Sequence, residues 1–419
     1  MISPATELAP TAAESEHDAD VRSFSGKRAA SERRTAVCHF TTAHTTLKSR
    51  SFHRQCVPLS EAGFELSYIS PAPPGGEAHG IHFVRVARSV SLPKRAFGQI
   101  RLLRTLLRQR AELYHFQDPQ LLPLGVALKL MFRKSVIYDA YEDFPSMAAY
   151  KATLPSVLRP LAARAIAGAE WLGAHCFDAI LTADPLTMRR LARVGRSRKL
   201  VFYNFPNLDF FPAPQERKKR FDLVYRGGLS ERAGTFLLLD ALQRLASEGR
   251  RIRLLLIGYC DNAENERQLH NQIAARGLAE QVEVRGRIPH GEMAGALAEA
   301  RIGVCPLMDV PKFRLNIPVK IFEYWACGLP VIASELPPSQ PFLRGMTAGV
   351  SFPAGYADRL ARAIAYLLDH PEKAKEMGAR GRDIIEQRLN NRHEARKLIS
   401  LCRALSEPVK AASAGYEHA

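Results

Sequence analysis

The chain has 419 residues, of which 46% are hydrophobic and 24% charged, a composition typical of globular proteins and unlike disordered, collagen-like or disulfide-scaffold chains. At about 150 residues per domain, this length predicts two or three domains. The 59 Lys and Arg residues outnumber the 42 Asp and Glu residues and give a net charge of +17, which favours an anionic partner. No uncharged apolar run approaches the roughly 18 residues of a membrane span.

Residues 1–34 are rich in Ala, Ser, Glu and Arg and lack the apolar centre of a secretory signal. We therefore expect a disordered tail at 1–34 and a cytoplasmic protein. The seven cysteines contain no Cys-x-x-Cys pair and lie mostly in apolar runs, which predicts buried thiols rather than zinc ligands or disulfides. No clustered set of His and Asp ligands is evident, so we expect no metal.

After the tail, short β-branched or aromatic runs alternate with longer amphipathic stretches, which is the signature of βαβ units and parallel sheets. Helices are expected between the strands. The sequence predicts a Rossmann-like domain over 35–205, with strands at 35–40, 65–70, 82–86, 113–116, 135–139, 179–182 and 199–203.

A Pro-rich, charged stretch at 206–220 predicts a linker. The alternation then restarts and predicts a second Rossmann-like domain over 221–390, a C-terminal helix at 391–405 and a polar tail at 406–419. The fold class is therefore α/β, with two doubly wound parallel sheets and ligands bound beyond the carboxyl ends of the strands, in a cleft between the domains. Strands are expected at 221–225, 251–257, 282–285, 302–306 and 331–334, and helices at 233–247, 262–276 and 291–300.

Two segments are locally very basic. Residues 94–110 carry six basic residues and no acid, and a stripe of apolar residues at a spacing of three or four runs through them: Phe97, Ile100, Leu103 and Leu107. Residues 189–199 add six more basic residues. A basic amphipathic helix at 94–110 is typical either of a peripheral anchor on an anionic membrane or of an ordinary surface helix whose arginines face water. The sequence leaves both interpretations open.

A glycine pair ends the opening strand of the second domain. At Gly227 and Gly228, backbone N–H groups can approach a phosphate with no side chain in the way, and a following helix N-terminus adds favourable potential. Arg232 lies a few residues further on and offers fixed donors to phosphate oxygens. The alternatives are glycines kept for conformational reasons and a solvated arginine.

The segment at 316–334 combines a helix start at Pro318 with Lys320 and Glu323, three apart on one helix face. A carboxylate beside the cleft can accept two hydrogen bonds from a vicinal diol such as that of a ribose. The alternative is a surface Lys–Glu pair worth ~0.2–0.5 kcal/mol.

This segment, NIPVKIFEYWACGLPVIAS, resembles the nucleotide-sugar-binding signature of retaining glycosyltransferases of family 4, which have the GT-B fold. Other stretches resemble the same family in the right order over about 37–398. They include CHFTTAHTTLKSRSFHRQC (38–56), YHFQDPQLLP (114–123), VIYDAYEDFP (136–145) and LVYRGGLS (223–230).

The resemblance implies that Glu323 holds the ribose, that Gly227, Gly228 and Arg232 bind the donor diphosphate, and that Ile288 lines the nucleobase. Lys320 joins them as a cation for the leaving phosphate. In the first domain, polar residues at predicted strand ends are the candidate acceptor contacts: His44, Arg50, Asp118 and Glu142. His115 and Gln117, at one such strand end, are with Arg232 and Lys320 the candidate catalytic residues. For each of these first-domain residues taken alone, the alternative is a structural role, either in a turn or as a core side chain whose hydrogen bonds are satisfied.

The chain departs from the family pattern mainly on the acceptor side. Leu315 stands where the first glutamate of Glu-x7-Glu would lie, although Pro318, Lys320 and Glu323 reproduce a Pro-x-Lys-x-x-Glu form. Gln117 and Tyr141 stand where the family pattern has histidines, and Lys48 stands where it has the aspartate of the opening loop. These changes bear on acceptor identity and turnover more than on donor binding.

The resemblance therefore implies a retaining, metal-independent transferase that moves a hexose-type sugar from a UDP- or GDP-linked donor, without a cofactor, to a glycan or lipid-linked acceptor in cell-surface polysaccharide synthesis. The helix at 94–110 would hold it on the inner face of the plasma membrane. The alternatives are a catalytically weakened relative that binds a nucleotide sugar or a partner glycosyltransferase, and an epimerase on the same fold. Nucleic-acid binding is not favoured, because the basic residues are not interleaved with stacking aromatics.

Overall fold

The computed structural model describes residues 34–42, 49–71, 73, 77–86, 92–149, 155–214 and 218–407, with side chains of the second helix described only from residue 98 onward. The predictions for the tail at 1–34, for His44 and Lys48, and for most of the tail at 406–419 lie outside these residues. The stretch 35–407 belongs to one compact unit, which is described below.

The first sheet has the strand order β3-β4-β2-β1-β5-β6-β7-β8. Every neighbouring pair is parallel except β3 with β4. This confirms the predicted parallel sheet, because all seven predicted strands differ by no more than two residues at either end from those found. The strands are β1 (Ala36–Phe40), β2 (Glu65–Ser70), β3 (Glu77–Ala78), β4 (Ile81–Arg85), β5 (Leu113–Phe116), β6 (Ser135–Ala140), β7 (Ala179–Thr182) and β8 (Arg198–Val201).

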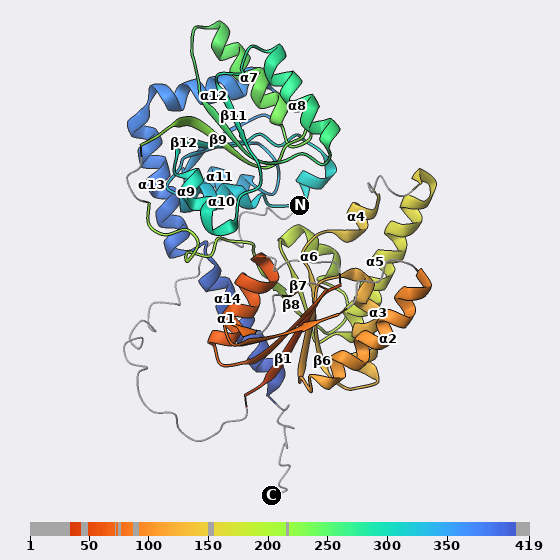
Figure 1. Ribbon diagram of the computed structural model, residues 1–419. Coiled ribbons are helices and arrows are strands. Elements are labelled where there is room, and N and C mark those ends of the chain that lie inside the picture. The colour runs from red at the N-terminus through yellow and green to blue at the C-terminus, as the bar shows by residue number, and fades with distance from the viewer. Residues whose placement is uncertain are drawn as a thin grey trace, which may run out of the picture. The chain divides into compact units, whose positions relative to one another are not determined.

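Helices cover both faces of the first sheet (Figure 1). One hydrophobic core joins the sheet to α2 (Leu92–Arg108), α3 (Leu122–Leu130) and α5 (Arg159–Cys176). The core on the other face joins it to η1 (Ser49–Cys56), a π-helix, to α1 (Val57–Glu61) and, from the far end of the chain, to α14 (Asn391–Ser406). The short helices α4 (Phe144–Ala149) and α6 (Pro185–Leu191) complete this half.

The basic helix α2 packs on the sheet through different residues from those expected. Leu102 and Leu106 are the buried ones, whereas Ile100, from the predicted stripe, is 52% exposed. Leu103 and Leu107 are only partly buried at the edge of the core. The apolar face of α2 is therefore used by the protein core, and its exposed residues beyond Ile100 are mainly arginines.

The second sheet has the order β11-β10-β9-β12-β13-β14, and all its neighbouring pairs are parallel. The strand β14 was not among the predicted strands. The strands are β9 (Phe221–Gly228), β10 (Leu254–Tyr259), β11 (Val282–Arg285), β12 (Ala300–Cys305), β13 (Val331–Ser334) and β14 (Gly349–Phe352). The helices are α7 (Thr235–Ser247), α8 (Ala263–Ala275), α9 (Met293–Leu297), α10 (Val319–Ala326), α11 (Gln340–Met346), α12 (Ala357–Asp369) and α13 (Pro371–Gln387).

The core of the second half is one continuous cluster that includes the strands β9, β10, β12 and β13 and the aromatic side chains of α10. Phe322, Tyr324 and Trp325 of α10 are each exposed by no more than 2%. Because these buried aromatic side chains anchor the short helix, its first residues are held in a fixed position beyond the carboxyl end of the sheet.

Candidate functional site

The glycine turn after β9 presents bare backbone. Gly227 has a φ of 140°, a conformation that side chains strongly disfavour, and an added Cβ would lie 2.8 Å from Lys320 Nζ. Gly234, which precedes α7, has a φ of 77°, and a Cβ there would lie 1.7 Å from the carbonyl oxygen of Pro306. Both positions therefore require glycine for conformational reasons, whether or not a ligand binds.

Lys320 is fixed beside this turn by Tyr225 of β9. Its ammonium group donates a hydrogen bond to the Tyr225 hydroxyl at 2.9 Å and lies 4.1 Å from the centroid of the same ring. The Tyr225 hydroxyl in turn donates to the carbonyl oxygen of Gly228 at 2.9 Å. A lysine held by a cation–π contact and one hydrogen bond keeps two N–H donors for other partners.

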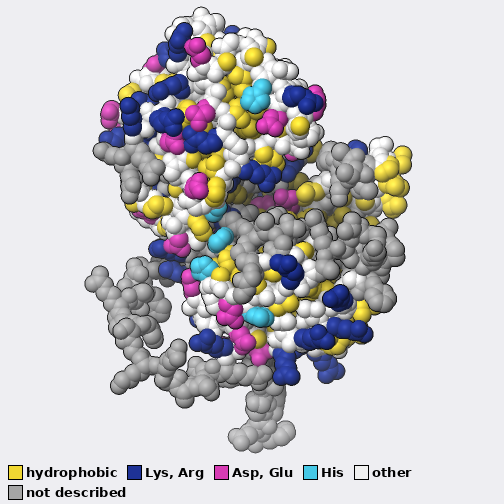
Figure 2. All heavy atoms as spheres, viewed as in Figure 1, with side chains coloured by type: hydrophobic (Ala, Val, Ile, Leu, Met, Phe, Trp, Pro, Cys, Tyr) yellow, Lys and Arg dark blue, Asp and Glu magenta, His cyan; other side chains and the backbone are white. Residues whose placement is uncertain are grey.

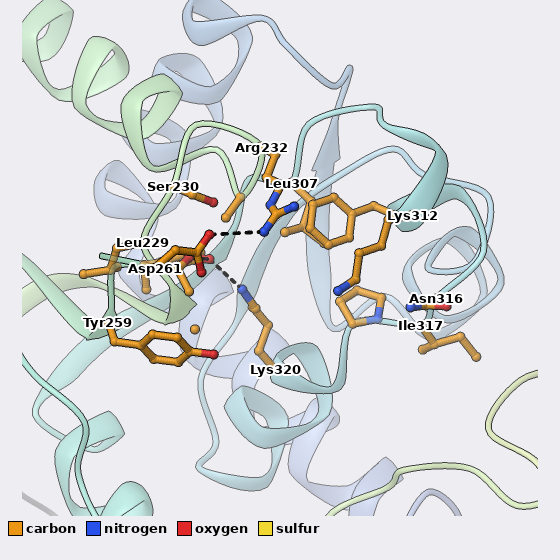
Figure 3. A pocket seen from close by; sticks show the side chains of 16 residues that line it. Leu229, Ser230, Arg232, Tyr259, Asp261, Leu307, Lys312, Asn316, Ile317 and Lys320 are labelled. Carbon is orange, nitrogen blue, oxygen red and sulfur yellow. Dashed lines mark hydrogen bonds and ion pairs between the residues drawn. The ribbon is translucent and has the colours of Figure 1, made fainter. Parts of the chain in front are cut away.

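These groups line one cavity of about 310 Å³. Figure 3 shows Arg232, Lys312 and Lys320 reaching into the same space from three different segments. The lining includes one acid, Asp261, whose carboxylate lies 3.3 Å from Arg232. The cavity is lined by Tyr225, Gly227, Gly228, Leu229, Ser230, Arg232, Ala233, Tyr259, Asp261, Leu307, Lys312, Phe313, Asn316, Ile317, Pro318 and Lys320.

The cavity is therefore suited to an anion. Three cations against one carboxylate, together with unhindered backbone at Gly227 and Gly228, form the kind of surface that binds phosphate groups. Beside these cations, Tyr259 offers an aromatic surface for a planar group, because it is 45% exposed. The Arg287 guanidinium carbon lies 3.6 Å from the centroid of the Tyr259 ring. An arginine stacked on a tyrosine at this distance stiffens both side chains.

Glu323 and Ile288 do not line the cavity. Glu323 is 1% exposed and forms an ion pair with Arg226, with Nε and Oε2 3.1 Å apart. Ile288 packs against the hydrophobic core. The roles predicted for them, on the ribose and the nucleobase, remain predictions, and binding of a ribose by Glu323 would require Arg226 to share or release the carboxylate.

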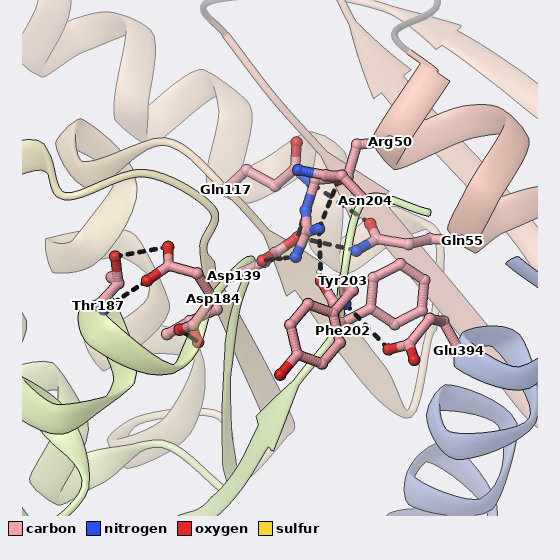
Figure 4. A network of polar contacts seen from close by, with 11 residues as sticks. Arg50, Gln55, Gln117, Asp139, Asp184, Thr187, Phe202, Tyr203, Asn204 and Glu394 are labelled. Atoms are coloured by element: carbon pink, nitrogen blue, oxygen red, sulfur yellow. Dashed lines mark hydrogen bonds and ion pairs between the residues drawn. The ribbon is translucent and has the colours of Figure 1, made fainter. Parts of the chain in front are cut away.

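In the first half of the chain, the predicted acceptor residue Arg50 lies in a buried network around Asp139 (Figure 4). The Arg50 guanidinium donates to both Asp139 oxygens, at 2.9 and 2.7 Å, and to the Phe202 carbonyl and Asn204 side chain. Burial alone would raise the pKa of Asp139, but Arg50 and the amide donors outweigh it and lower this pKa to about 2.

Gln117 belongs to the same network. Its amide donates to Asp139 at 2.8 Å and to Gln55 at 3.3 Å, and its side chain is 1% exposed. Direct contact of Arg50 or Gln117 with an acceptor therefore does not follow from the structure. Gln117 follows the strand β5, as predicted, whereas Arg50 lies in the π-helix η1, and the donors of both are used inside the protein.

Two other predicted residues are also buried. His115 is 1% exposed, its ring lies edge-on to His39 with centroids 4.8 Å apart, and burial lowers its pKa to about 4. Asp118 accepts hydrogen bonds from the Thr41 hydroxyl at 2.8 Å and the Thr42 amide at 2.6 Å. Neither residue lines the two cavities described here. Asp118 is satisfied by its hydrogen bonds at the strand ends, whereas the buried His115 Nε2 has no hydrogen-bond partner among the described residues.

Among the predicted acceptor residues that the structure describes, Glu142 lines a cavity. This second cavity, of about 150 Å³, is smaller than the first. Its lining also includes Asn316 and Ile317, which line the larger cavity as well. The two cavities therefore share one short segment, 316–317, immediately before α10.

Several lining residues were not found from the sequence. Tyr225 lies two residues before the glycine pair, and Asp261 follows the carboxyl end of β10, so strand-end position was the available signal for both. Lys312 and Asn316 lie in or beside a short 3-10 helix, Pro311–Arg314, in a segment with no regular pattern.

Within the described residues, no group of three or more His, Cys, Asp or Glu side chains is arranged to hold a metal ion. In the same part of the chain, no helix is both long and apolar enough to cross a bilayer. The seven cysteines are free thiols, five of them buried and two half-buried.

Comparison with known proteins finds a family match within the second half of the chain. Residues 208–384 match the family described as glycosyl transferases group 1. These residues contain the glycine turn, the anion cavity and α10. With its two parallel, helix-covered sheets, the chain has the GT-B fold of glycosyltransferases.

Individual relatives are more distant. A phosphatidyl-myo-inositol mannosyltransferase of Mycobacterium leprae (strain TN) is 30% identical over 156 residues, which are 37% of this chain and 39% of that protein. The matches to curated relatives span 39% to 56% of those proteins' lengths.

Solved structures match over a longer stretch. A sucrose-phosphate synthase from Thermosynechococcus elongatus has a TM-score of 0.70 at 19% identity, covering 89% of this chain and 99% of that one. The Anabaena protein HepE in complex with UDP-glucose has a TM-score of 0.69 at 14% identity, covering 88% of this chain and 100% of that one. At these identities, the likeness establishes the fold.

Proposed function

We propose that the protein is a glycosyltransferase that takes a hexose-type sugar from a UDP- or GDP-linked donor. The observation that carries the proposal is the cavity in which Lys320, Arg232 and Lys312 surround the bare turn at Gly227 and Gly228. A nucleotide sugar has two adjacent phosphates, and this cavity offers several cations and unhindered amides. The group 1 match over 208–384 supports the same proposal.

The reaction that suits this site is displacement of the nucleoside diphosphate from the anomeric carbon. Negative charge grows on the leaving phosphate as the sugar becomes oxocarbenium-like, so fixed positive groups at the phosphate stabilise the transition state more than the ground state. Lys320 and Arg232 would provide this charge without a metal ion. We propose retention of configuration, with the leaving phosphate accepting the proton of the acceptor hydroxyl.

The acceptor is proposed to be a glycan or lipid-linked precursor of a cell-surface polysaccharide. It would approach by Glu142, which lines the smaller cavity next to Asn316 and Ile317. The exposed Arg101, Arg104 and Arg108 of α2 would hold the protein on an anionic membrane surface, each contributing ~1 kcal/mol. Vesicle sedimentation with and without anionic lipid tests this last part.

A second function is favoured by two observations. Arg50 and Gln117 use their donors inside the Asp139 network, and Leu315 replaces a glutamate of the family pattern. A protein that binds the nucleotide sugar with little turnover, on its own or for a partner glycosyltransferase, would have these properties. Donor binding without hydrolysis or transfer across a range of acceptors would favour it.

Donor binding is tested by thermal-shift measurements with UDP, GDP and ADP and their sugars. A ligand present at about 100 times its dissociation constant adds ~2.7 kcal/mol of stability. Lys320→Met should abolish the shift. The matched control is Lys375→Met, because Lys375 is exposed on α13 and away from the lining residues. If no nucleotide shifts the wild-type protein, or if both variants behave alike, the proposal is wrong.

A further inference from the structure

The exposed surface of the first half has an unusual composition. Within the described residues of 100–205, every exposed Asp, Glu, Lys or Arg side chain is an arginine. The acids of this stretch are all buried or half-buried. The exposed arginines are Arg101, Arg104, Arg108, Arg110, Arg133, Arg164, Arg189, Arg193, Arg196 and Arg198.

Most of the large hydrophobic side chains exposed on the described surface lie in the same stretch. Elsewhere in the described chain, those exposed are three tyrosines, Tyr259, Tyr356 and Tyr366. Between 100 and 205 they are instead mostly aliphatic: Ile100, Leu130, Met131, Phe132, Met147, Val157, Leu158, Leu161, Trp171 and Leu172.

Helix α5 carries the centre of this apolar surface. Leu161, Ala165, Gly168 and Leu172 are all exposed and follow a spacing of four, three and four residues, so they form one stripe along the helix. A stripe with this spacing normally faces a core. Here the core side of α5 is occupied by Gly173 and Ala174, which are buried, and the stripe faces outward. Trp171, next to it, is 55% exposed.

The acid of α5 is kept away from this surface. Glu170 is fully buried, where it accepts a hydrogen bond from the Tyr138 hydroxyl at 2.8 Å and pairs with Arg190 at 2.6 Å. The outer face of α5 therefore presents aliphatic groups, a tryptophan, Arg164 and His175, with no negative charge.

The apolar stripe and the arginines are on the same side of the sheet. Helices α2, α3 and α5 all pack on one face of the first sheet, and Leu130 and Met131 lie at the end of α3. In Figure 2, hydrophobic side chains gather over the beginning of α5, and Lys and Arg side chains gather over α2. Apolar groups and positive charge thus both lie on the helices that cover this face of the first sheet.

We propose that the outer face of α5, with the end of α3, inserts into the interface of an anionic lipid bilayer and that the surrounding arginines bind the lipid head groups. We call this surface, centred on Leu161, Trp171 and Leu172, the α5 surface. Trp with aliphatic residues on one face and basic residues beside them is the pattern of an interfacial helix. Basic side chains near such a surface are attracted to anionic lipids, and indole rings favour the head-group level.

Charge decides between a bilayer and a second copy of the chain. Two α5 surfaces facing each other would bring arginines together without a carboxylate to pair with them, and like charges in contact oppose association. A nucleic acid would satisfy the arginines but not the aliphatic stripe. The proposal is independent of the sugar donor, since none of the cavity's lining residues belongs to the α5 surface.

Tryptophan fluorescence tests the proposal directly, because the chain has two tryptophans and the other, Trp325, is fully buried. Vesicles of phosphatidylcholine and phosphatidylglycerol should shift the emission of the full-length protein to shorter wavelength, and brominated acyl chains should quench it. Vesicles of phosphatidylcholine alone should have a much smaller effect. Trp171→Phe should remove the shift, whereas an unchanged shift in this variant would contradict insertion of Trp171.

Binding strength is measured by vesicle sedimentation. Leu161→Ser with Leu172→Ser should weaken partitioning by about tenfold or more, and Arg164→Gln with Arg193→Gln should weaken it and reduce its salt dependence. The matched control is Tyr356→Ser with Tyr366→Ser, which removes two exposed large side chains from the other half of the chain and should leave partitioning unchanged. All variants should keep the wild-type melting temperature and nucleotide response, which separates this proposal from donor binding.

Three results would overturn the proposal. The first is equal partitioning of the α5 and control variants. The second is a wild-type dimer in light scattering that the Leu161→Ser and Leu172→Ser pair converts to monomer, with no vesicle binding. The third is arginine-dependent binding to RNA with no binding to vesicles.

Discussion

The Arg50 guanidinium and the Asp139 carboxylate form a bidentate pair across 89 positions of sequence, and both are buried. Removing one partner of such a pair leaves an uncompensated charge in the protein interior. We expect Arg50→Met to cost about 3–5 kcal/mol of the free energy of unfolding, measured by urea denaturation.

The matched control for this prediction is an exposed bidentate pair. Arg314 donates to both oxygens of Asp309, at 2.5 and 2.7 Å, but the Arg314 side chain is 60% exposed. Arg314→Met should therefore cost far less of the free energy of unfolding than Arg50→Met, because water screens an exposed pair. Equal losses in the two variants would contradict the assignment of Arg50 to a buried, stabilising network.

Stability should also depend on pH through His115. Burial lowers the pKa of this histidine to about 4, from an ordinary value of 6.5. Between these values, the unfolded chain binds a proton that the folded protein does not, so stability is lost as the pH falls from 6.5 to 4. The expected loss at the lower end is about 3 kcal/mol.

The measurement is the melting temperature of wild type and His115→Gln between pH 8 and pH 4. The variant should lose less stability than wild type over this range, even if it is less stable at pH 8. His82→Gln is the matched control, since it also removes a histidine side chain, one that is 58% exposed. A His115→Gln profile parallel to that of wild type would contradict the prediction.

Much of the fold was predictable because its signals are local. The strands at Glu65–Ser70, Leu113–Phe116, Ala179–Thr182 and Val282–Arg285 were predicted at their observed bounds. A parallel strand buried on both faces produces a short apolar run that is visible without any knowledge of its neighbours. Position at the end of a strand likewise identified the cavity residues Gly227 and Gly228, and position at a helix start identified Lys320.

Other features depend on distant partners. The consecutive pairs Leu102–Leu103 and Leu106–Leu107 offer two stripes on α2, and packing against the sheet selects Leu102 and Leu106. Asp139 lies within a strand pattern, and nothing near it reveals that Arg50 and Gln117 approach it. The outward orientation of the α5 stripe was unpredictable for the same reason, since periodicity shows a face but not the direction in which it points.

Tyr225 is expected to position the Lys320 ammonium. Tyr225→Phe keeps the ring and its cation–π contact, at 4.1 Å, but removes the hydroxyl that accepts from Lys320 and donates to Gly228. The net loss of one such hydrogen bond is about 1 kcal/mol. Nucleoside diphosphate affinity, measured by titration calorimetry, should therefore fall about fivefold.

A readout of positioning separates this role from a structural one. In Tyr225→Phe, the affinity for UDP or GDP should fall while the affinity for the corresponding nucleoside, which lacks phosphate, stays the same. Tyr225→Leu removes the ring as well and should weaken diphosphate binding further. If nucleoside and nucleoside diphosphate lose affinity equally, Tyr225 acts on the shape of the cavity and not on Lys320.

The glycine pair allows the sharpest comparison in the cavity. Gly227 has a φ of 140°, and an added Cβ would lie 2.8 Å from Lys320 Nζ and 3.2 Å from the Tyr225 hydroxyl. A Cβ on Gly228 would meet nothing within 4 Å, and its φ is not in the positive range. Gly227→Ala should thus strain the backbone at a cost of about 1–3 kcal/mol and displace the ammonium of Lys320.

Thermal unfolding of the two variants, with and without nucleoside diphosphate, measures both effects. Gly227→Ala should lower the melting temperature and remove most of the stabilisation by the ligand, whereas Gly228→Ala should keep the wild-type melting temperature. Gly228 also lines the cavity, so the methyl group added in Gly228→Ala tests how closely a phosphate approaches the backbone there. If this variant keeps its stability but loses the stabilisation by ligand, the phosphate contacts the backbone at this residue. Equal melting temperatures for Gly227→Ala and wild type would show that the turn does not require a left-handed residue, and that Lys320 is not held by the geometry described.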